Sequence, residues 1–256
     1  MDKPYVGVTG IVSVAEVDYV AKQFGNLYAN INSHSPAIGF LTSNETLKGV
    51  NSNRRFPDLK TINALLERTP QGISRVIHYK TKDTKTLANQ IARLFGEHCC
   101  EDLCDIIQLN MPFEETNQIS IINSLFGIKI ALKIPNYNLS VKEIANKVSA
   151  YGNSINYALI ELPENRQGIF NIDAQINLYN ELSSRPAGWI VGFVGGFTAW
   201  NTEERLSEMI SKVGSKNFCI DAVGGLRDKI TSEKNDDLLD HKKVKQYLKS
   251  VASVLR

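Results

Sequence analysis

The chain has 256 residues, of which 43% are hydrophobic and 22% are charged, and its formal net charge is +2. No apolar run approaches the roughly 18 residues that a membrane-spanning helix needs, and the chain is too apolar and too nearly neutral to be disordered. So small a net charge gives no general attraction for nucleic acid, whose binders concentrate basic residues on one face. We therefore expect a globular protein with a substantial core, with neither a nucleic acid nor a membrane as its partner.

Eight short apolar segments rich in Val and Ile predict the strands of a parallel sheet that is covered on both faces. In chain order they are Tyr5–Ile11, Ala37–Thr42, Arg75–Lys80, Asp105–Asn110, Ile128–Ile134, Tyr157–Glu161, Trp189–Val194 and Phe218–Ala222. Between these segments apolar residues recur with the 3.6-residue period of a helix. The last such stripe consists of Val244, Tyr247, Leu248, Val251 and Leu255.

Two helix starts carry capping patterns. Ser140 with Glu143 forms a capping box, which satisfies backbone amides at a helix start. Asn201 with Glu204 offers a similar pair, and it predicts a helix start that the Asn201 side chain caps.

Eight alternating strand and helix units in about 250 residues predict a single-domain (β/α)8 TIM barrel, an α/β fold, spanning residues 1–256. The rival is a doubly wound sheet, which is also built from right-handed βαβ units. A dinucleotide-binding sheet of that kind usually carries G-x-G-x-x-G after its first strand, and this chain has no such motif there. The barrel is therefore the favoured fold.

Cysteine usage and the first residues favour a cytoplasmic protein. The opening MDKPYVGV has no apolar h-region and is not a secretory signal. Cys99, Cys100, Cys104 and Cys219 lack the paired spacing of a zinc site, so we expect reduced thiols. His34, His98 and His241 show no metal-binding spacing either. No metal or organic cofactor is predicted.

Two glycine pairs follow the predicted seventh and eighth strands, where phosphate sites in this fold frequently lie. Glycine lets backbone amides approach an anion closely, and consecutive amides can form a concave nest. The predicted phosphate-binding residues are Gly195, Gly196, Phe197, Gly224, Gly225 and Leu226.

The same two segments resemble phosphoribosylanthranilate isomerases. Residues 194–201 are similar to the A-G-G-L-T-P-x-N segment of that family, and residues 220–226 to its V-D-V-S-S-G-V segment. Residues 240–245 resemble its K-D-x-x-K-I helix start. Shorter likenesses link residues 8–11 to I-C-G-I and residues 108–110 to Q-L-H.

The resemblance implies acid–base (Amadori-type) isomerisation of a small phosphorylated sugar derivative, in tryptophan biosynthesis, without a cofactor. Family members open a ribose ring with a general acid and remove a C2 proton with a general base. Thr9 occupies the position of the base, and Glu161 is the nearest match to the acid. Arg54 and Arg55 lie roughly where the family keeps an Arg for the substrate carboxylate. The sequence leaves a homodimer open.

The chain departs from the family pattern at three places. Thr9 replaces the basic Cys, and a Thr hydroxyl is a poor base at neutral pH without a strong neighbour. Asn110 with Met111 replaces a His–Gly pair, and Val223 with Gly224 replaces a Ser pair. One catalytic group is therefore missing and the acid is conservatively replaced.

Other residues near the strand ends are compatible with alternative functions. Lys129 and Lys133 alternate along the fifth strand, so they share one face. If that face is the interior, one Lys could form a Schiff base, as in a lyase or aldolase, or hold an anion. Asp221 could hold a sugar hydroxyl, and His78 is either a packing residue or a catalyst. A non-catalytic barrel that binds a phosphorylated ligand is the third reading.

Overall fold

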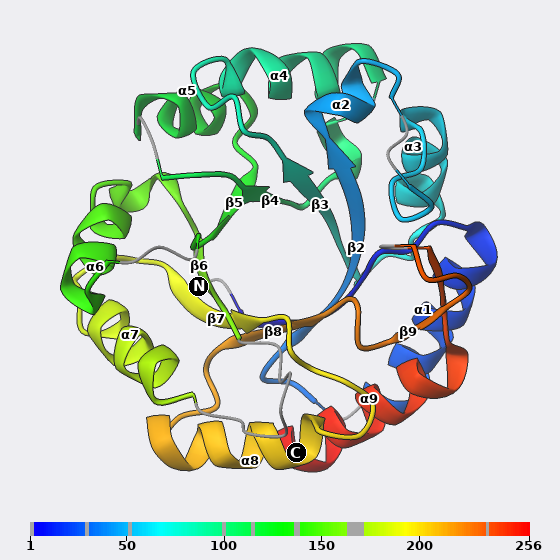
Figure 1. The fold of residues 1–256 in the computed structure, drawn as a ribbon, viewed down its shortest axis with the longest axis vertical. Coiled ribbons are helices and arrows are strands. Elements are labelled where there is room, and N and C mark those ends of the chain that lie inside the picture. Colours follow the sequence, from blue (N-terminus) through cyan, green and yellow to red (C-terminus); the bar gives the residue numbers. More distant parts are fainter. Residues whose placement is uncertain are drawn as a thin grey trace.

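The computed structural model describes residues 3–28, 31–50, 53–98, 101–113, 116–135, 139–162, 172–233 and 236–256. Within these residues eight parallel strands close into a barrel in sequence order (Figure 1). The strands are β1 (Tyr5–Thr9), β2 (Ser35–Ser43), β3 (Ser74–Lys80), β4 (Ile106–Asn110), β5 (Lys129–Lys133), β6 (Tyr157–Glu161), β7 (Ile190–Val194) and β8 (Cys219–Ala222). The predicted TIM barrel is confirmed, and each predicted strand matches an observed strand to within two residues at either end.

Helices surround the barrel and alternate with its strands (Figure 1). They are α1 (Val14–Tyr28), α2 (Asn44–Leu47), α3 (Leu59–Arg68), α4 (Leu87–Arg93), α5 (Thr116–Phe126), α6 (Val141–Ser149), α7 (Asp173–Ser183), α8 (Thr202–Val213) and α9 (His241–Leu255). Short helical turns also cover Leu94–His98, Glu101–Leu103 and Gly152–Ser154. Helix α9 packs against both α1 and α8, so the last helix of the chain closes the ring beside the first.

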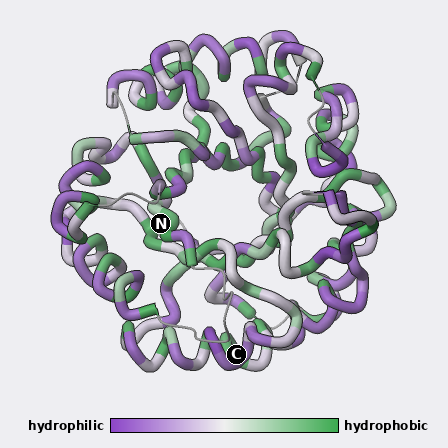
Figure 2. Tube along the Cα trace, in the orientation of Figure 1, coloured by the Kyte–Doolittle hydropathy of each residue, from purple (hydrophilic) through white to green (hydrophobic). Residues whose placement is uncertain are grey.

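The main core lies between the strands and the helices. Along the helices, hydrophobic and hydrophilic residues alternate with the turn, whereas the strands are largely hydrophobic (Figure 2). In α9, Val244, Leu248 and Val251 are fully buried, which confirms the predicted stripe. Burying such aliphatic side chains stabilises the fold by roughly 1.5–3 kcal/mol each.

The barrel interior has an apolar part and a polar part. Side chains of successive residues alternate between the two faces of a strand, so every second residue points inward. Toward the strand N-termini the interior is filled by a cluster that includes Tyr5, Val76, Ile106, Ala131 and Tyr157. Two residues further along β3, β4 and β5, and four further along β1, polar side chains replace this apolar filling. The polar side chains therefore gather at the C-terminal end of the barrel.

Two strand glycines make room for that polar layer. A Cβ at Gly7 would lie 3.0 Å from Asp221 Cγ and still closer to Oδ1, so it would overlap the carboxylate. A Cβ at Gly39 would overlap the Thr9 hydroxyl and lie 2.8 Å from His78 Nε2. Contacts this short are not available to real Cβ atoms, so both positions are restricted to glycine by packing and not by turn geometry.

The starts of α6 and α8 and the segment after β8 can be compared with the sequence pattern. The Ser140–Glu143 capping box at the start of α6 is present. Helix α8 begins after Asn201, as predicted, but the Asn201 side chain makes no capping hydrogen bond to it, so that part of the prediction is wrong. An antiparallel hairpin of β9 (Arg227–Lys229) and β10 (Asp237–Leu239), which the sequence pattern did not predict, follows β8.

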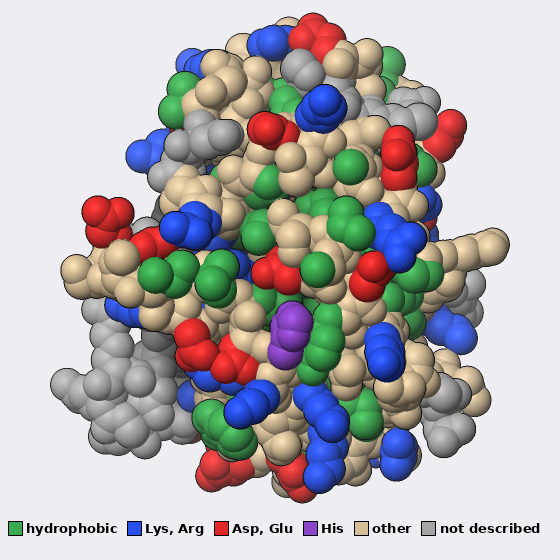
Figure 3. Space-filling view, turned by 90° about the vertical axis from the view of Figure 1, so that its right-hand side faces the viewer, with side chains coloured by type: hydrophobic (Ala, Val, Ile, Leu, Met, Phe, Trp, Pro, Cys, Tyr) green, Lys and Arg blue, Asp and Glu red, His purple; other side chains and the backbone are tan. Residues whose placement is uncertain are grey.

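Acidic and basic side chains are interspersed on the face that carries α1, α9 and the hairpin (Figure 3). None of the described helices is both long and apolar enough to cross a membrane. Cys104 and Cys219 are buried and form no disulfide, whereas Cys99 and Cys100 lie outside the described residues.

Candidate active site

A cavity of about 900 Å³ opens at the C-terminal end of the barrel. It is lined by residues of strands β2 to β8, by the loops that follow β2, β7 and β8, and by the first two turns of α8. Its polar lining comprises Arg55, His78, Gln108, Asn110, Lys133, Glu161, Thr198, Asn201, Glu204, Arg205, Glu208 and Asp221. This is the end of the fold at which TIM-barrel active sites lie.

A buried chain of three side chains from β1, β3 and β8 lies at this end. The Thr9 hydroxyl donates to Asp221 Oδ1 at 2.8 Å and lies 3.1 Å from His78 Nε2. All three residues are at most 3% exposed. Because the single hydroxyl proton of Thr9 goes to the carboxylate, its oxygen accepts a hydrogen bond from His78, and that assigns the proton of the ring to Nε2.

Burial sets the protonation states of Asp221 and His78 in this hydrogen-bonded chain of side chains. It raises the pKa of Asp221 from 3.8 to about 7, against the opposing effects of the Thr9 hydrogen bond, the Ala222 amide and the Lys133 charge. Burial also lowers the pKa of His78 from 6.5 to about 3, and the Lys133 charge lowers it further. At neutral pH His78 is therefore neutral, whereas Asp221 is divided between its acid and carboxylate forms.

Lys133 and Glu161 form an ion pair at the rim, with 2.6 Å between Nζ and Oε1. Both side chains line the cavity and remain partly exposed. Lys129, Ala131 and Lys133 share the inward face of β5, as alternation predicts, and Ala131 is fully buried in the interior. Lys129 lies at the opposite, N-terminal end of the strand and is exposed, so only Lys133 lines the cavity.

The loop after β7 is held in place by hydrogen bonds of its own. Gly195 and Gly196 have φ angles of 73° and 68°, in the left-handed region that favours glycine. The Asn201 side chain accepts from the Thr198 amide at 2.8 Å and donates to the Gly196 carbonyl at 3.1 Å. Asn201 therefore braces the loop where the sequence suggested that it would cap α8.

The amides of this loop and of the loop after β8 are not all available to a ligand. The Gly195 amide donates to Asp221 O at 3.1 Å, and the Leu226 amide donates to Val223 O at 3.3 Å. Leu226 is also fully buried and does not line the cavity. The expectation that these two amides face an anion is therefore not met, although Gly195 itself lines the cavity.

Gly225 has a packing role that the sequence analysis did not foresee. It pairs with Thr198 in an isolated parallel bridge between the two loops. A Cβ at this position would overlap the carbonyl of Phe197 and lie 2.9 Å from Thr198 Cα. The close approach is to protein backbone, so a substitution here disturbs the loops themselves.

Arg205 is a cavity residue that the sequence analysis missed. Its guanidinium donates to the Gly196 carbonyl, and the residue is 4% exposed. Burial lowers its pKa, partly offset by the charges of Glu204 and Glu208. The signal was present in the sequence, because Arg205 precedes Met209 by four residues and so lies on the apolar stripe of α8.

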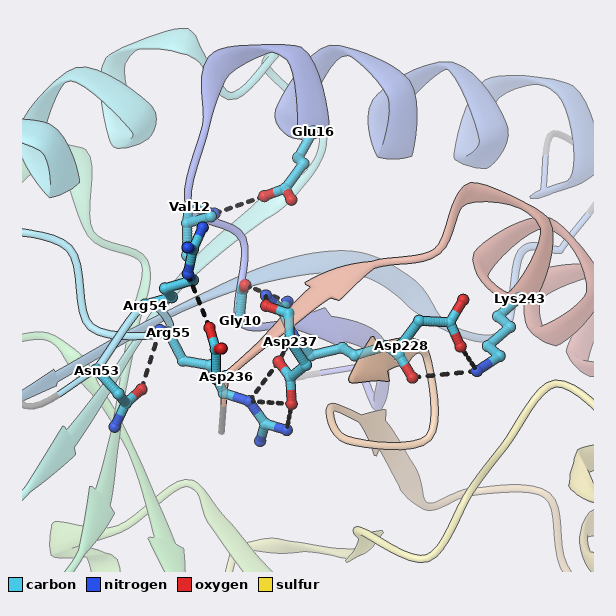
Figure 4. Close-up of polar contacts among 11 residues, drawn as sticks. Gly10, Val12, Glu16, Asn53, Arg54, Arg55, Asp228, Asp236, Asp237 and Lys243 are labelled. Atoms are coloured by element: carbon cyan, nitrogen blue, oxygen red, sulfur yellow. Dashed lines mark hydrogen bonds and ion pairs between the residues drawn. The ribbon is translucent and has the colours of Figure 1, made fainter. Parts of the chain in front are cut away.

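The two candidate Arg residues of the loop after β2 have different surroundings (Figure 4). Arg54 is 61% exposed in its side chain and pairs with Asp236 at 2.8 Å, and it does not line the cavity. Arg55 is mostly buried, lines the cavity and donates to both carboxylate oxygens of Asp237. The structure thus separates Arg55, a cavity residue, from Arg54, a surface residue.

Asp237 also binds Arg227, and the hairpin is thereby tied to the barrel. Arg227 Nε donates to Asp237 Oδ1 at 2.6 Å, and Nη1 donates to the Gly10 carbonyl at 2.7 Å. Burial raises the pKa of Asp237, but the hydrogen bonds from Arg55 and Arg227 outweigh it and lower the pKa overall. Two guanidinium groups share one carboxylate, so this cluster of three residues carries a net positive charge beside the cavity.

Of the two predicted acid–base residues, Glu161 lines the cavity and Thr9 does not, since its side chain is covered by its neighbours. His78, Lys133 and Asp221 line the cavity as well. Among the described residues no three His, Cys, Asp or Glu side chains are grouped so that they could hold a metal ion.

Comparison with solved structures gives matches over nearly the whole chain. Phosphoribosyl anthranilate isomerase from Thermus thermophilus is 16% identical with a TM-score of 0.62, covering 97% of this chain and 98% of its own. A second isomerase, in complex with reduced 1-(o-carboxyphenylamino)-1-deoxyribulose 5-phosphate, is 13% identical with a TM-score of 0.62, covering 98% and 99%. Truncated 3-deoxy-D-arabino-heptulosonate 7-phosphate synthase from Thermotoga maritima is 14% identical with a TM-score of 0.58, covering 99% and 88%.

No protein-family model matches the chain, and no curated protein matches it significantly. At these identities the structural matches establish the fold alone, since one fold hosts different reactions. The chain is therefore a (β/α)8 barrel similar in fold to phosphoribosyl anthranilate isomerases, as the sequence resemblance predicted.

Proposed function

We propose that the protein is an isomerase of a small phosphorylated sugar derivative, acting by acid–base chemistry in the cavity at the C-terminal end of the barrel. The observation that carries the proposal is the lining of that one cavity. It joins the two glycine loops after β7 and β8 to a set of ionisable side chains, Glu161, His78 and Asp221. Such a combination suits a ligand with a phosphate at one end and a reacting carbon nearby.

The phosphate end is assigned to the loops after β7 and β8. The positive φ of Gly196 and the cavity lining by Gly196, Phe197 and Gly224 support an amide nest there. Arg205 adds a guanidinium on the same side, which suits phosphate geometry. These two features supply hydrogen-bond donors for a phosphate at this end of the cavity, where Glu204 and Glu208 also lie beside Arg205.

The sugar end is assigned to the ends of β4, β5 and β6. Gln108 is buried, and among the described residues its Oε1 atom has no hydrogen-bond partner. A sugar hydroxyl could donate to this atom, which would remove the cost of an unsatisfied buried acceptor. Glu161 is assigned as the general acid for ring opening, and because it is paired with Lys133 its carboxyl group has to take up a proton and leave that pair before it can donate.

The Schiff-base alternative uses Lys133, the one strand-five Lys that lines the cavity. That reaction needs the free amine lone pair, whereas Lys133 is engaged in an ion pair with Glu161. Borohydride reduction in the presence of phosphorylated aldehydes or ketones tests it. A trapped adduct on Lys133 would replace isomerisation by lyase chemistry, and its absence leaves the isomerase as the better proposal.

The direct test is conversion of phosphoribosylanthranilate, followed by the loss of its fluorescence. We expect turnover by the parent, and a loss of at least a hundredfold in Glu161→Gln, the size usual for a missing general acid. Glu181→Gln is the matched control, because Glu181 of α7 pairs with Arg185 just beyond the end of that helix and does not line the cavity. Full turnover in Glu161→Gln would remove the acid assignment. Absence of turnover in the parent, with phosphorylated ligands still bound, would favour the non-catalytic barrel.

A further inference from the structure

The acid–base reaction requires a group that removes a proton from carbon, and the residue at the position of the family's base is poorly arranged for this. Thr9 is 1% exposed and does not line the cavity. Its only hydroxyl proton is donated to Asp221 at 2.8 Å. A threonine hydroxyl in this arrangement is a donor to a carboxylate, and removal of its proton would place two negative charges in contact.

Asp221 has the properties that Thr9 lacks. It lines the cavity, and its carboxylate lies in a space that Gly7 keeps free of any Cβ atom. From the neighbouring strand β7, the backbone amide of Gly195 donates to the backbone carbonyl of Asp221, which ties β8 to the phosphate loop. The proton acceptor is thereby fixed relative to the loop assigned to the phosphate.

We propose that Asp221 is the general base of the reaction, and that Thr9 and His78 are positioning residues that hold its carboxylate through a hydrogen-bonded chain. This assignment rests on the proposed isomerase function and deepens it. In the chain, His78 Nε2 donates to Thr9 Oγ1, and Thr9 Oγ1 donates to Asp221 Oδ1. This hydrogen-bonded chain of side chains occupies one carboxylate oxygen of Asp221, Oδ1.

The step balances without any further reactant. Ring opening yields a protonated imine at C1 of the sugar derivative. The Asp221 carboxylate takes the proton from C2, the electron pair of that C–H bond forms the C1=C2 double bond, and the electrons of the C=N bond move to nitrogen. Asp221 is left as the neutral acid, and the product is a neutral enaminol. The protonated Asp221 then returns its proton to C1, and the proton of the C2 hydroxyl passes to the Glu161 carboxylate that ring opening left behind, so the enol becomes a ketone and both carboxyl groups regain their starting forms.

The pH at which Asp221 is ionised, and so can accept a proton, depends on the groups around it. Tyr5 and Thr9 of β1 and Lys133 of β5 interact with Asp221, Cys219 lies on its own strand, and His78 of β3 is linked to it through Thr9. His78 stays neutral, and burial raises the pKa values of Tyr5 and Cys219 well above neutral pH. Lys133 is the one cation of this set, and burial of Asp221 outweighs it, leaving a pKa of about 7. A pKa near the working pH suits a general base.

The first experiment is independent of turnover. Carbon-13 NMR of protein labelled at the aspartate carboxyl carbons is recorded from pH 4 to pH 9 for the parent, Asp221→Asn, Thr9→Val and Thr9→Ser. We expect one carboxyl to titrate near pH 7, to be missing in Asp221→Asn, to titrate at a higher pH in Thr9→Val and to return toward the parent value in Thr9→Ser. A purely structural Thr9 would leave that titration unchanged. If the carboxyl of Asp221 titrates below about pH 5, the proposal is overturned.

The second experiment follows phosphoribosylanthranilate conversion against pH in the same variants. We expect Asp221→Asn to lose at least a hundredfold in kcat with a smaller change in KM, and Thr9→Val to shift the rising limb of kcat/KM to higher pH. Asp18→Asn, at a surface ion pair with Arg68, is the matched control. Turnover within threefold of the parent in Asp221→Asn overturns the base assignment while leaving the isomerase intact. No turnover in the parent, combined with a carboxyl that titrates near pH 7 and responds to Thr9→Val, refutes the chosen substrate and supports the poised carboxylate.

Discussion

Replacing Asp221 by Asn is expected to stabilise the protein, increasingly so as the pH rises. Asn keeps the size of the side chain and an oxygen that accepts the Thr9 hydrogen bond, but it removes the buried charge. In the folded chain the pKa of Asp221 is raised from 3.8 to about 7 by burial. The folded state therefore binds this proton more tightly than the unfolded state does. The contribution of Asp221 protonation to the free energy of unfolding is fully present below pH 3.8 and is lost as the pH rises to about 7.

The size of the effect follows from the two pKa values. A difference of one pKa unit corresponds to about 1.4 kcal/mol, so ionising Asp221 in the fold costs about 4 kcal/mol above pH 7. At pH 5 only part of this cost has developed, about 2 kcal/mol by the same linkage relation. The stability advantage of Asp221→Asn over the parent should thus grow by about 2 kcal/mol between pH 5 and pH 8.

Because His78 also titrates, the pH dependence of the stability of the parent protein alone does not reveal the contribution of Asp221. The pKa of His78 falls from 6.5 to about 3 in the fold, so its contribution to stability increases with pH across that interval. Between about pH 4 and pH 6.5 this increase opposes the decrease due to Asp221, and the two nearly cancel. Removing the carboxyl exposes the His78 contribution, so Asp221→Asn should gain stability as the pH rises through this interval.

Urea unfolding of the parent, Asp221→Asn and the control Asp18→Asn at pH 5 and pH 8 measures these differences. Asp18 lies on the surface of α1, so its replacement should not reproduce the trend. An advantage of Asp221→Asn that is equal at both pH values would refute the raised pKa. A variant less stable than the parent at pH 8 would show that the carboxylate is a net stabilising group, contrary to the desolvation argument.

Three further predictions concern packing and charge around the cavity. Gly225→Ala should lower the midpoint of thermal unfolding because its Cβ would overlap the backbone of the facing loop, whereas Gly188→Ala, in open space, should not. Asp237→Asn should destabilise the protein by about 3–5 kcal/mol in urea unfolding, because Arg227 would remain buried without its charged partner, and a loss below 1 kcal/mol would contradict this. Arg205→Met should weaken binding of a phosphorylated ligand by about tenfold or more, or about 1.4 kcal/mol, in calorimetric titration, and unchanged affinity would remove Arg205 from the phosphate site.

The sequence was sufficient for the barrel because its strands are buried on both faces. Runs such as Ala37–Leu41 and Trp189–Val194 are apolar without interruption, and a parallel sheet under helices is the arrangement that buries them. The strand ends then follow, and with them the placement of Lys133, Glu161 and Asp221 at one end of the barrel. Periodicity and alternation alone carry this part of the prediction.

Contacts between distant segments could not be predicted in the same way. The hydrogen bond from Thr9 to Asp221 joins residues 212 apart, and it depends on the register between β1 and β8. The Arg227–Asp237 pair depends on a hairpin whose short strands carry no apolar pattern. The hydrogen bonds of the Gly195 amide, likewise, are set by where β7 and β8 end relative to each other.

We propose that the cavity binds a phosphorylated sugar derivative through the loops after β7 and β8. Calorimetric titration with reduced 1-(o-carboxyphenylamino)-1-deoxyribulose 5-phosphate and with the same compound lacking its phosphate tests this most directly. We expect the phosphorylated compound to bind at least about tenfold more tightly, a difference of about 1.4 kcal/mol that Gly196→Val should abolish. Equal affinities for the two compounds, or a difference that Gly196→Val leaves intact, would contradict the account.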